Sequence, residues 1–264
     1  HPARLHRRRI SGAAVPGCMF VCIRGTAADG HAFIEEALQR GAAAVVTERE
    51  VPVMKGSGAI FIRVRDTRRA LSRLCNAFWG NPARDMRLVA VTGTNGKTSV
   101  SAMLKAIFDA AMIPCGLIGT VGCYPPAADT PICGEDGQPY SGMTTPDPAE
   151  LYPLLARMAS EVPQNSAKRP VVVMEVTSHA LALGKVAPLT FDLSVFTNLS
   201  SEHMDMHGTM EDYFEAKLTL FDVSREAVVN ADDHYGRMLM KEPLSVRRTV
   251  RHLPERPDPW SRTA

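Results

Sequence analysis

The sequence lacks the features of membrane, secreted and nucleic-acid-binding proteins. In its 264 residues no apolar run reaches the roughly 18 residues that cross a bilayer, and no charged and then apolar leader precedes a cleavage site. The net charge is only +2, and the basic clusters at residues 7–9, 68–69 and 247–248 are short and hold no aromatic residues. We therefore expect a cytoplasmic protein without membrane insertion and without nucleic-acid binding.

Cysteines with metal-ligand spacing are also missing. None of the six forms a C-x-x-C motif or lies near a pair of histidines: Cys18, Cys22, Cys75, Cys115, Cys123 and Cys133. This arrangement argues against a zinc site and against a disulfide framework. The chain is 45% hydrophobic, which is enough to bury the core of one large or two modest domains.

Residues 88–111, LVAVTGTNGKTSVSAMLKAIFDAA, predict a strand, a glycine-rich turn and a helix. In such a turn Gly93 and Gly96 permit backbone conformations that a Cβ forbids, Lys97 places a cation near phosphates, and the Thr98 hydroxyl can hold Mg²⁺. The motif therefore indicates ATP or GTP binding. Because Val91 replaces the first glycine of the strict G-x-x-x-x-G-K-[ST] pattern, a plain tight connection remains an alternative.

The residues before this stretch alternate between strand and helix patterns. Strands are predicted at 19–23, 43–47 and 59–64, with a helix at 32–39 and a second helix that Asp66 caps. Together they predict a small α/β domain at residues 1–84, followed by a second domain at 85–240 and an irregular tail at 241–264. The loop at 25–30, which contains Thr26, either contacts a ligand or forms a plain polar turn.

Polar residues recur beside the later elements. Thr144 and Thr145 precede a helix that Thr145 can cap, where they either bind an anionic or sugar ligand or only cap. The apolar run 171–176 places Glu175 at the end of a buried strand, as a candidate Mg²⁺ ligand facing Thr98 or as a structural carboxylate. His203 is a candidate metal ligand on spacing alone, because it alternates with two further polar residues, Asp205 and His207.

The helix at 210–221 contains Lys217, which periodicity alone places as an ordinary surface lysine. A buried strand at 191–197 precedes this region. A P-loop GTPase is a further alternative, although its aspartate at the end of the buried strand is here Glu175.

In combination these motifs resemble the Mur ligase family. The segments that carry the resemblance are VAVTGTNGKTS, GLIGTVG, TTPDPAEL, MEVTSHAL and FDLSVFTNLSSEHMDMHGTMEDYFEAK, together with the N-terminal PGCMFVCIRGTAADGHAFIEEALQRGAAAVV and the later VVNADD. They cover roughly residues 15–233 in one order. Within the family they look most like the UDP-N-acetylmuramoyl-tripeptide synthetases rather than the related alanine-alanine adding ligases, and folylpolyglutamate synthetases usually have glycine where this chain has Thr98.

The resemblance implies an α/β fold with a small N-terminal UDP-MurNAc-binding domain and a P-loop, mostly parallel-sheet ATP-binding domain. It implies an ATP- and Mg²⁺-dependent amide ligase of peptidoglycan synthesis, which activates UDP-MurNAc-L-Ala-D-Glu as an acyl phosphate for attack by a diamino acid. Site residues transfer by motif position. The ATP-binding residues are Gly93, Thr94, Asn95, Gly96, Lys97, Thr98 and Ser99, the metal ligands are Thr98, Glu175 and His203, and Lys97, His203 and a carbamylated Lys217 are catalytic. The substrate-binding residues are Ser11, Thr26, Ala27, Ala28, Thr144, Thr145, Thr177 and Lys185.

The chain departs from the family pattern near both ends and at two positions between them. Ile10, Ser11 and Gly12 stand where an Asp-Ser-Arg triplet is usual, and Leu183 and Lys185 stand where glutamine and arginine are common. The Arg- and Pro-rich residues 241–264 do not resemble the family's third domain, which binds the incoming amino acid. The expectation is a truncated chain that binds nucleotide and ligates poorly or not at all, and the alternative is a nucleotide-binding module without ligase chemistry.

Overall fold

The structure is a computed structural model that describes residues 14–25, 28–51, 58–126, 128–133, 143–162, 168–201 and 208–242 and the backbone of 250–252. The chain divides into two compact units. Unit 1 comprises the described residues of His1–Asn81 together with Asp147–Pro153 and Leu183–Pro188, and unit 2 comprises the remainder. The units are therefore not contiguous in sequence, because two later segments return to the first one.

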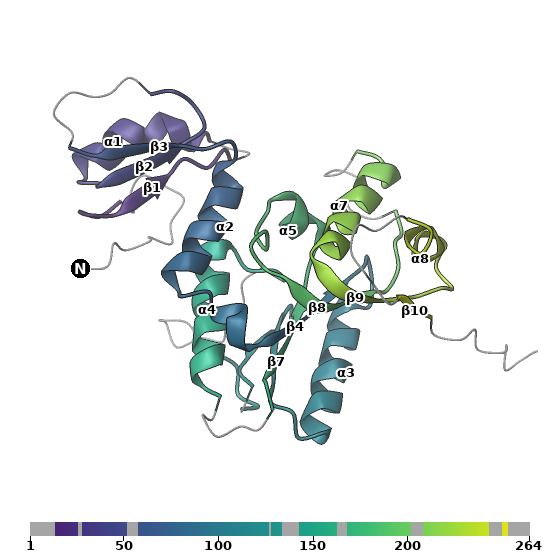
Figure 1. Cartoon of the computed structure of the whole chain (residues 1–264). Coiled ribbons are helices and arrows are strands. Elements are labelled where there is room, and N and C mark those ends of the chain that lie inside the picture. Colours follow the sequence, from purple (N-terminus) through teal and green to yellow (C-terminus); the bar gives the residue numbers. More distant parts are fainter. Residues whose placement is uncertain are drawn as a thin grey trace, which may run out of the picture. The chain divides into compact units, whose positions relative to one another are not determined.

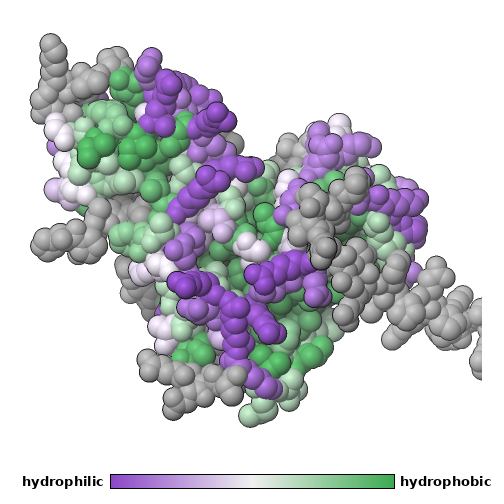
Figure 2. Space-filling model, in the orientation of Figure 1, coloured by the Kyte–Doolittle hydropathy of each residue, from purple (hydrophilic) through white to green (hydrophobic). Residues whose placement is uncertain are grey.

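Unit 1 contains a three-stranded parallel sheet in the order β1 (Met19–Val21), β2 (Ala44–Thr47) and β3 (Ile60–Arg63). The short helices η2 (Gly30–Phe33) and α1 (Ile34–Gln39) connect β1 to β2, and Ile34 packs with Cys22 and Val45 in a buried cluster. Hydrophobic residues gather over this small sheet on the face shown in Figure 2.

Helix α2 (Thr67–Phe78) follows β3 and begins where the sequence predicted. The Asp66 side chain accepts a hydrogen bond from the backbone N–H of Arg69 at 2.9 Å, which is the bond of an N-cap residue. After α2 the backbone adopts positive φ at Gly80 (73°) and Asn81 (56°), which ends the helix before η3 (Pro82–Asp85).

Unit 2 is built on a seven-stranded sheet in the order β10-β9-β8-β4-β7-β5-β6 (Figure 1). The strands are β4 (Arg87–Thr92), β5 (Cys115–Gly119), β6 (Gly122–Tyr124), β7 (Val171–Glu175), β8 (Phe191–Phe196), β9 (Ser224–Val229) and β10 (Val250–His252). All of the pairings are parallel except that of β5 with β6. Strand β10 lies in the segment for which the sequence predicted no regular structure.

Helices cover both faces of this sheet. Helix α3 (Lys97–Ala110) packs Val100, Leu104 and Phe108 against a buried cluster of β4, β5 and β7 residues. On the opposite face, Met158 of α4 (Pro148–Ser160) lies against Gly116. The remaining helices are α5 (Ser178–Ala182), α7 (Met210–Asp222) and α8 (His234–Leu239). Among the described residues no helix is long and apolar enough to cross a membrane.

The strand order positions the site. Strand β4 lies between β7 and β8, although both follow it late in the sequence. The register pairs Val91 with Glu175 and Thr92 with Phe196, so the carboxyl ends of all three strands meet at one edge. Ligands of open α/β sheets bind at this edge, where neighbouring connections leave in opposite directions.

Candidate active site in unit 2

The glycine-rich turn connects β4 to α3 as the sequence predicted. Gly93 has φ of 147° and Gly96 has φ of 84°, both in the region that favours glycine. A Cβ on Gly93 would lie 1.9 Å from Thr197 Oγ1, so a side chain has no room there. Gly96 is the N-cap residue of α3 and has no side chain with which to cap it, which suits a helix end that receives an anion.

Lys97 folds back over this turn. Its ammonium donates hydrogen bonds to the carbonyl oxygens of Gly93 at 2.9 Å and of Thr94 at 2.7 Å. The cation therefore lies beside the backbone of the turn, where it can compensate phosphate charge. Ser99 is exposed on the first turn of α3, and Asn95 is exposed at the tip.

The residues that follow β8 form hydrogen bonds with the glycine-rich turn. The sequence alone did not predict these contacts. Thr197 Oγ1 and Asn198 Nδ2 both donate to the carbonyl oxygen of Asn95, at 2.7 and 3.1 Å. Asn198 Oδ1 accepts from the N–H of Asn95 at 3.0 Å. The signal that could have revealed these residues is their position immediately after a buried strand.

Glu175 meets Thr98 at the sheet edge. The Thr98 hydroxyl donates to Glu175 Oε2 at 3.0 Å, although the two residues are 77 positions apart. Glu175 is only 1% exposed, and Thr120 also donates to its carboxylate from the backbone N–H at 2.9 Å. A hydroxyl and a carboxylate that converge in this way are hard oxygen ligands of the kind that Mg²⁺ takes together with phosphates and water.

Thr145 does not cap α4, contrary to the expectation, because that helix begins later, at Pro148. Its hydroxyl instead donates to the carbonyl oxygen of Glu175 at 2.9 Å and accepts from the N–H of Thr177 at 3.1 Å. Thr144 lies next to it, with its hydroxyl 3.0 Å from Thr120 Oγ1. The predicted substrate-binding residues Thr144, Thr145 and Thr177 are therefore linked by hydrogen bonds to Glu175, to Thr120 beside it, or to each other.

Lys217 is buried, contrary to the expectation from periodicity alone, with only 1% of its surface exposed. It shares the inward face of α7 with Tyr213, and its Nζ lies 4.8 Å from the centre of that ring and 3.4 Å from Thr92 Oγ1. Burial, and then the nearby charge of Lys97, lower the pKa of Lys217 from 10.5 to about 7. Helical spacing puts Lys217 on the same side as Tyr213 and Phe214, four and three residues before it, but does not show whether its ammonium reaches solvent.

Among the described residues, two predicted substrate-binding residues lie in unit 1. Lys185 is 3% exposed and forms an ion pair with Asp147, with Nζ 3.0 Å from Oδ1. Ala28 is exposed, and its carbonyl oxygen accepts a hydrogen bond from the N–H of Gly25 at 2.8 Å. The predicted residues Ser11, Thr26, Ala27 and His203 lie outside the described residues. Within the described ranges no group of three or more metal-binding side chains occurs.

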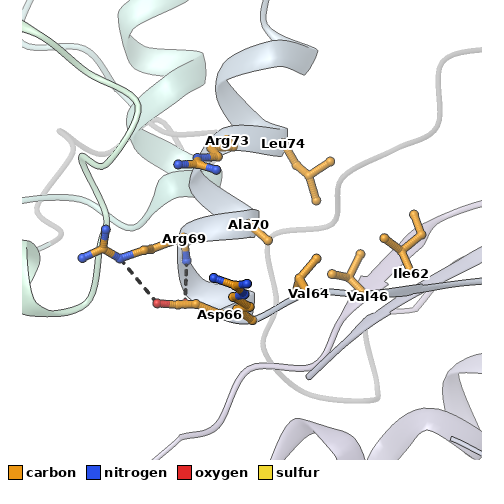
Figure 3. A pocket seen from close by; sticks show the side chains of 9 residues that line it. Val46, Ile62, Val64, Asp66, Arg69, Ala70, Arg73 and Leu74 are labelled. Atoms are coloured by element: carbon orange, nitrogen blue, oxygen red, sulfur yellow. Dashed lines mark hydrogen bonds and ion pairs between the residues drawn. The ribbon is translucent and has the colours of Figure 1, made fainter. Parts of the chain in front are cut away.

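A cavity of about 490 Å³ in unit 1 contains none of the predicted site residues. Val46, Ile62 and Val64 point from the small sheet toward Ala70 and Leu74 of α2 (Figure 3). Its acid, Asp66, is already the N-cap of α2 and pairs with Arg69 at 3.5 Å. This lining offers no nucleophile and no pair of acids, so the chemistry of the described residues centres on unit 2.

Family models match both parts of the chain. The model for the Mur ligase middle domain matches residues 91–251, and the model for the Mur ligase family catalytic domain matches residues 6–79. The chain belongs to the Mur ligase family. Members of this family are ATP-dependent amide ligases that act in peptidoglycan synthesis, and the expected fold class is confirmed.

Curated relatives agree with this assignment. The chain is 42% identical to a UDP-N-acetylmuramoyl-L-alanyl-D-glutamate–2,6-diaminopimelate ligase of Chlorobaculum tepidum. The alignment of 226 residues covers 84% of this chain and 41% of the relative. The chain is 38% identical over 233 residues to the ligase of the same name from Alkaliphilus metalliredigens, which covers 88% of this chain and 44% of the relative. The chain therefore spans less than half the length of these relatives.

Solved structures show the same fold. A ligase structure of that name aligns over 93% of this chain and 47% of its own, with a TM-score of 0.70 and 25% identity. The structure of a MurF ligase from Thermotoga maritima in complex with ADP aligns over 93% of this chain and 49% of its own, with a TM-score of 0.53 and 22% identity. Because the sequence identity to the MurF ligase is only 22%, that similarity shows a shared fold and nothing more.

Proposed function

We propose that this chain supplies the nucleotide-binding and UDP-sugar-binding parts of a ligase that adds 2,6-diaminopimelate to UDP-MurNAc-L-Ala-D-Glu in the cytoplasm. The observation that carries the proposal is the 3.0 Å contact of Thr98 with Glu175 at the end of the glycine-rich turn. It supports a site for Mg²⁺ and ATP. The printed names of the relatives support diaminopimelate as the added amino acid.

In this proposal residues 93–99 bind the polyphosphate. The N-terminus of α3 and the ammonium of Lys97 compensate its negative charge, while Thr98 and Glu175 hold one Mg²⁺. The donor set fits this ion, because it offers one hydroxyl and one carboxylate and leaves the other positions to phosphate and water. His203 is proposed at a second Mg²⁺.

The reaction needs charge compensation because both reactants are anions. A carboxylate oxygen of the D-glutamate unit attacks the γ-phosphorus of ATP, and the bond from that phosphorus to the β-phosphate bridging oxygen breaks, which releases ADP. The amine of the diamino acid then attacks the acyl carbon, phosphate leaves, and the amine gives up a proton. Lys97 and the backbone of the turn stabilise the charge that moves in the first step.

Lys217 is proposed to act as a carbamate. Since its pKa is lowered to about 7, far more of the amine is neutral at neutral pH than in an ordinary lysine. A neutral amine can attack CO₂, forming an N–C bond and releasing a proton, which replaces a buried cation by an anion that can orient Mg²⁺.

Substrate contacts are proposed for eight residues. They are Ser11, Thr26, Ala27, Ala28, Thr144, Thr145, Thr177 and Lys185. The hydrogen bonds of Thr144, Thr145 and Thr177 near Glu175 support a place for the acceptor close to the metal.

The test separates a ligase from a nucleotide-binding module without ligase chemistry. Calorimetry with ATP, with Mg²⁺ and with EDTA, measures nucleotide binding, and ADP release is then followed with and without UDP-MurNAc-L-Ala-D-Glu. ADP release that depends on the dipeptide supports a ligase, whereas Mg²⁺-dependent binding with no such release supports the module. A chain that binds no ATP in either condition contradicts both.

A further inference from the structure

The Glu175 side chain packs against the end of the neighbouring strand β5. We call these surroundings, Gly119 and Thr120, the seat of Glu175. Strands β5 and β7 run in parallel with Ile118 opposite Met174, so the residues that end the two strands lie side by side. Gly119 is the last residue of β5, and Thr120 follows it. Both residues lie against the Glu175 carboxylate.

Gly119 provides the space that the carboxylate fills. A Cβ at this position would lie 2.2 Å from Glu175 Oε1 and 2.9 Å from its Cδ. Real Cβ atoms do not approach other atoms so closely, so any larger residue would displace the carboxylate or the strand. The absence of a side chain at Gly119 is therefore a condition for the observed position of Glu175.

Thr120 holds both oxygens of the same carboxylate. Its backbone N–H donates to Oε1 at 2.9 Å, and its hydroxyl donates to Oε2 at 3.3 Å. Two donors from one residue, one on each oxygen, fix the plane of the carboxylate as well as its place. One edge of Oε2 then faces the Thr98 hydroxyl, where the metal is proposed.

The donor directions connect this seat to the loop at residues 144–145. The Thr120 hydroxyl donates its single proton to Glu175 Oε2, so it can only accept a further hydrogen bond. The Thr144 hydroxyl, 3.0 Å away, is then the donor to Thr120 Oγ1. The next residue, Thr145, donates to the backbone carbonyl oxygen of Glu175. Thr144 therefore supports the Glu175 carboxylate through Thr120, and Thr145 holds the Glu175 backbone directly.

We propose that Gly119 and Thr120 are positioning residues that fix the Glu175 carboxylate so that one oxygen is presented to a divalent cation shared with Thr98. A glutamate side chain without hydrogen-bond partners samples several rotamers. The contacts of Gly119 and Thr120 restrict Glu175 to one of them before the cation binds. The inference rests on the proposed function, since it needs Mg²⁺-dependent nucleotide binding.

The test compares Thr120→Val with Thr120→Ser in the full chain. Valine keeps the shape and the backbone N–H but removes the hydroxyl, whereas serine keeps the hydroxyl. Calorimetry measures how many fold Mg²⁺ tightens ATP binding relative to EDTA. We expect this enhancement to fall about tenfold in Thr120→Val and to stay at the wild-type level in Thr120→Ser, with equal binding in EDTA for all three proteins.

Two further variants sharpen the comparison. Gly119→Ala should also lose the Mg²⁺ enhancement, because its Cβ occupies the place of the carboxylate. Thr219→Val is the matched control, because that hydroxyl donates at 2.7 Å to the carbonyl oxygen of Ala216 within its own helix. It should bind ATP as the wild type does in both conditions.

Each outcome decides the question. A Thr120→Val protein with the full Mg²⁺ enhancement overturns the inference, and so does an equal loss of binding with Mg²⁺ and with EDTA, which would mark a merely structural role. If Thr120→Val fails to fold, Gly119→Ala decides in its place. A wild-type chain that binds ATP equally with and without Mg²⁺ instead overturns the proposed metal site and this inference with it.

Discussion

Replacing Lys217 by methionine tests the electrostatics of the site most directly. The methionine has a similar length and apolar stem but carries no amine. In the wild type, burial and the charge of Lys97 lower the pKa of this amine from 10.5 to about 7. At about 1.4 kcal/mol per pKa unit, burying the amine costs about 5 kcal/mol of folding free energy below pH 7.

The pH dependence follows from the sign of that change. Between pH 7 and 10.5 the unfolded chain binds the proton on Lys217 and the folded chain does not, so the stability of the wild type rises with pH. We expect Lys217→Met to be about 4 kcal/mol more stable than the wild type at pH 7. The difference should shrink by about 1.4 kcal/mol per pH unit up to about pH 10.

The assay is urea unfolding followed by circular dichroism at pH 7, 8, 9 and 10, in buffers freed of CO₂ so that no carbamate forms. The control is Lys241→Met, which removes an exposed lysine and should leave the curve of stability against pH unchanged. A Lys217→Met protein no more stable than the wild type at pH 7, or one whose advantage stays constant to pH 10, would refute the reasoning.

Three further predictions concern the space around Gly93, the N-cap of α2 and the interactions of Asp29. Gly93→Ala should abolish ATP binding measured by calorimetry, because its Cβ would collide with Thr197 Oγ1; retained affinity would mean that the turn relaxes at little cost. Asp66→Ala should lower the free energy of unfolding by about 1 kcal/mol in urea, with Asp66→Asn close to the wild type, because only alanine removes the cap of α2. Asp29→Asn should be less stable than the wild type at pH 7, because hydrogen bonds from His31 and the charge of Arg49 lower the pKa of Asp29 below 3.8. That stability is present above the ordinary pKa and is lost as the pH falls, so the two thermal unfolding temperatures should converge in acid, and a constant gap would contradict this account.

Local patterns predicted much of unit 2 because the signals that encode it lie within a few residues of each other. The run of apolar residues that forms β4, the glycines after it and the spacing of α3 are all readable in one stretch. The N-cap of α2 at Asp66 is likewise a local signal, since the capping bond spans only three residues. The position of Glu175 at the end of a buried strand was also predicted from sequence.

Other features needed contacts that no local pattern carries. Thr145 was predicted to cap a helix, but its hydroxyl finds a better-placed partner in the Glu175 carbonyl 30 residues away. The burial of Lys217 depends on what packs against α7, and helical spacing alone does not distinguish an inward lysine from a stem that reaches the surface. Thr197 and Asn198 matter because β8 happens to lie beside β4.

The sequence by itself determined the strand, turn and helix that can hold a polyphosphate, and the family to which the chain belongs, because both are carried by short stretches of consecutive residues. The tertiary structure decided how Thr98, Thr120 and Glu175 meet. They come from segments 77 and 55 residues apart that only the parallel order of β5, β7 and β4 brings to one edge. Strand order depends on the packing of the whole sheet, and that is information which no single stretch of the chain contains.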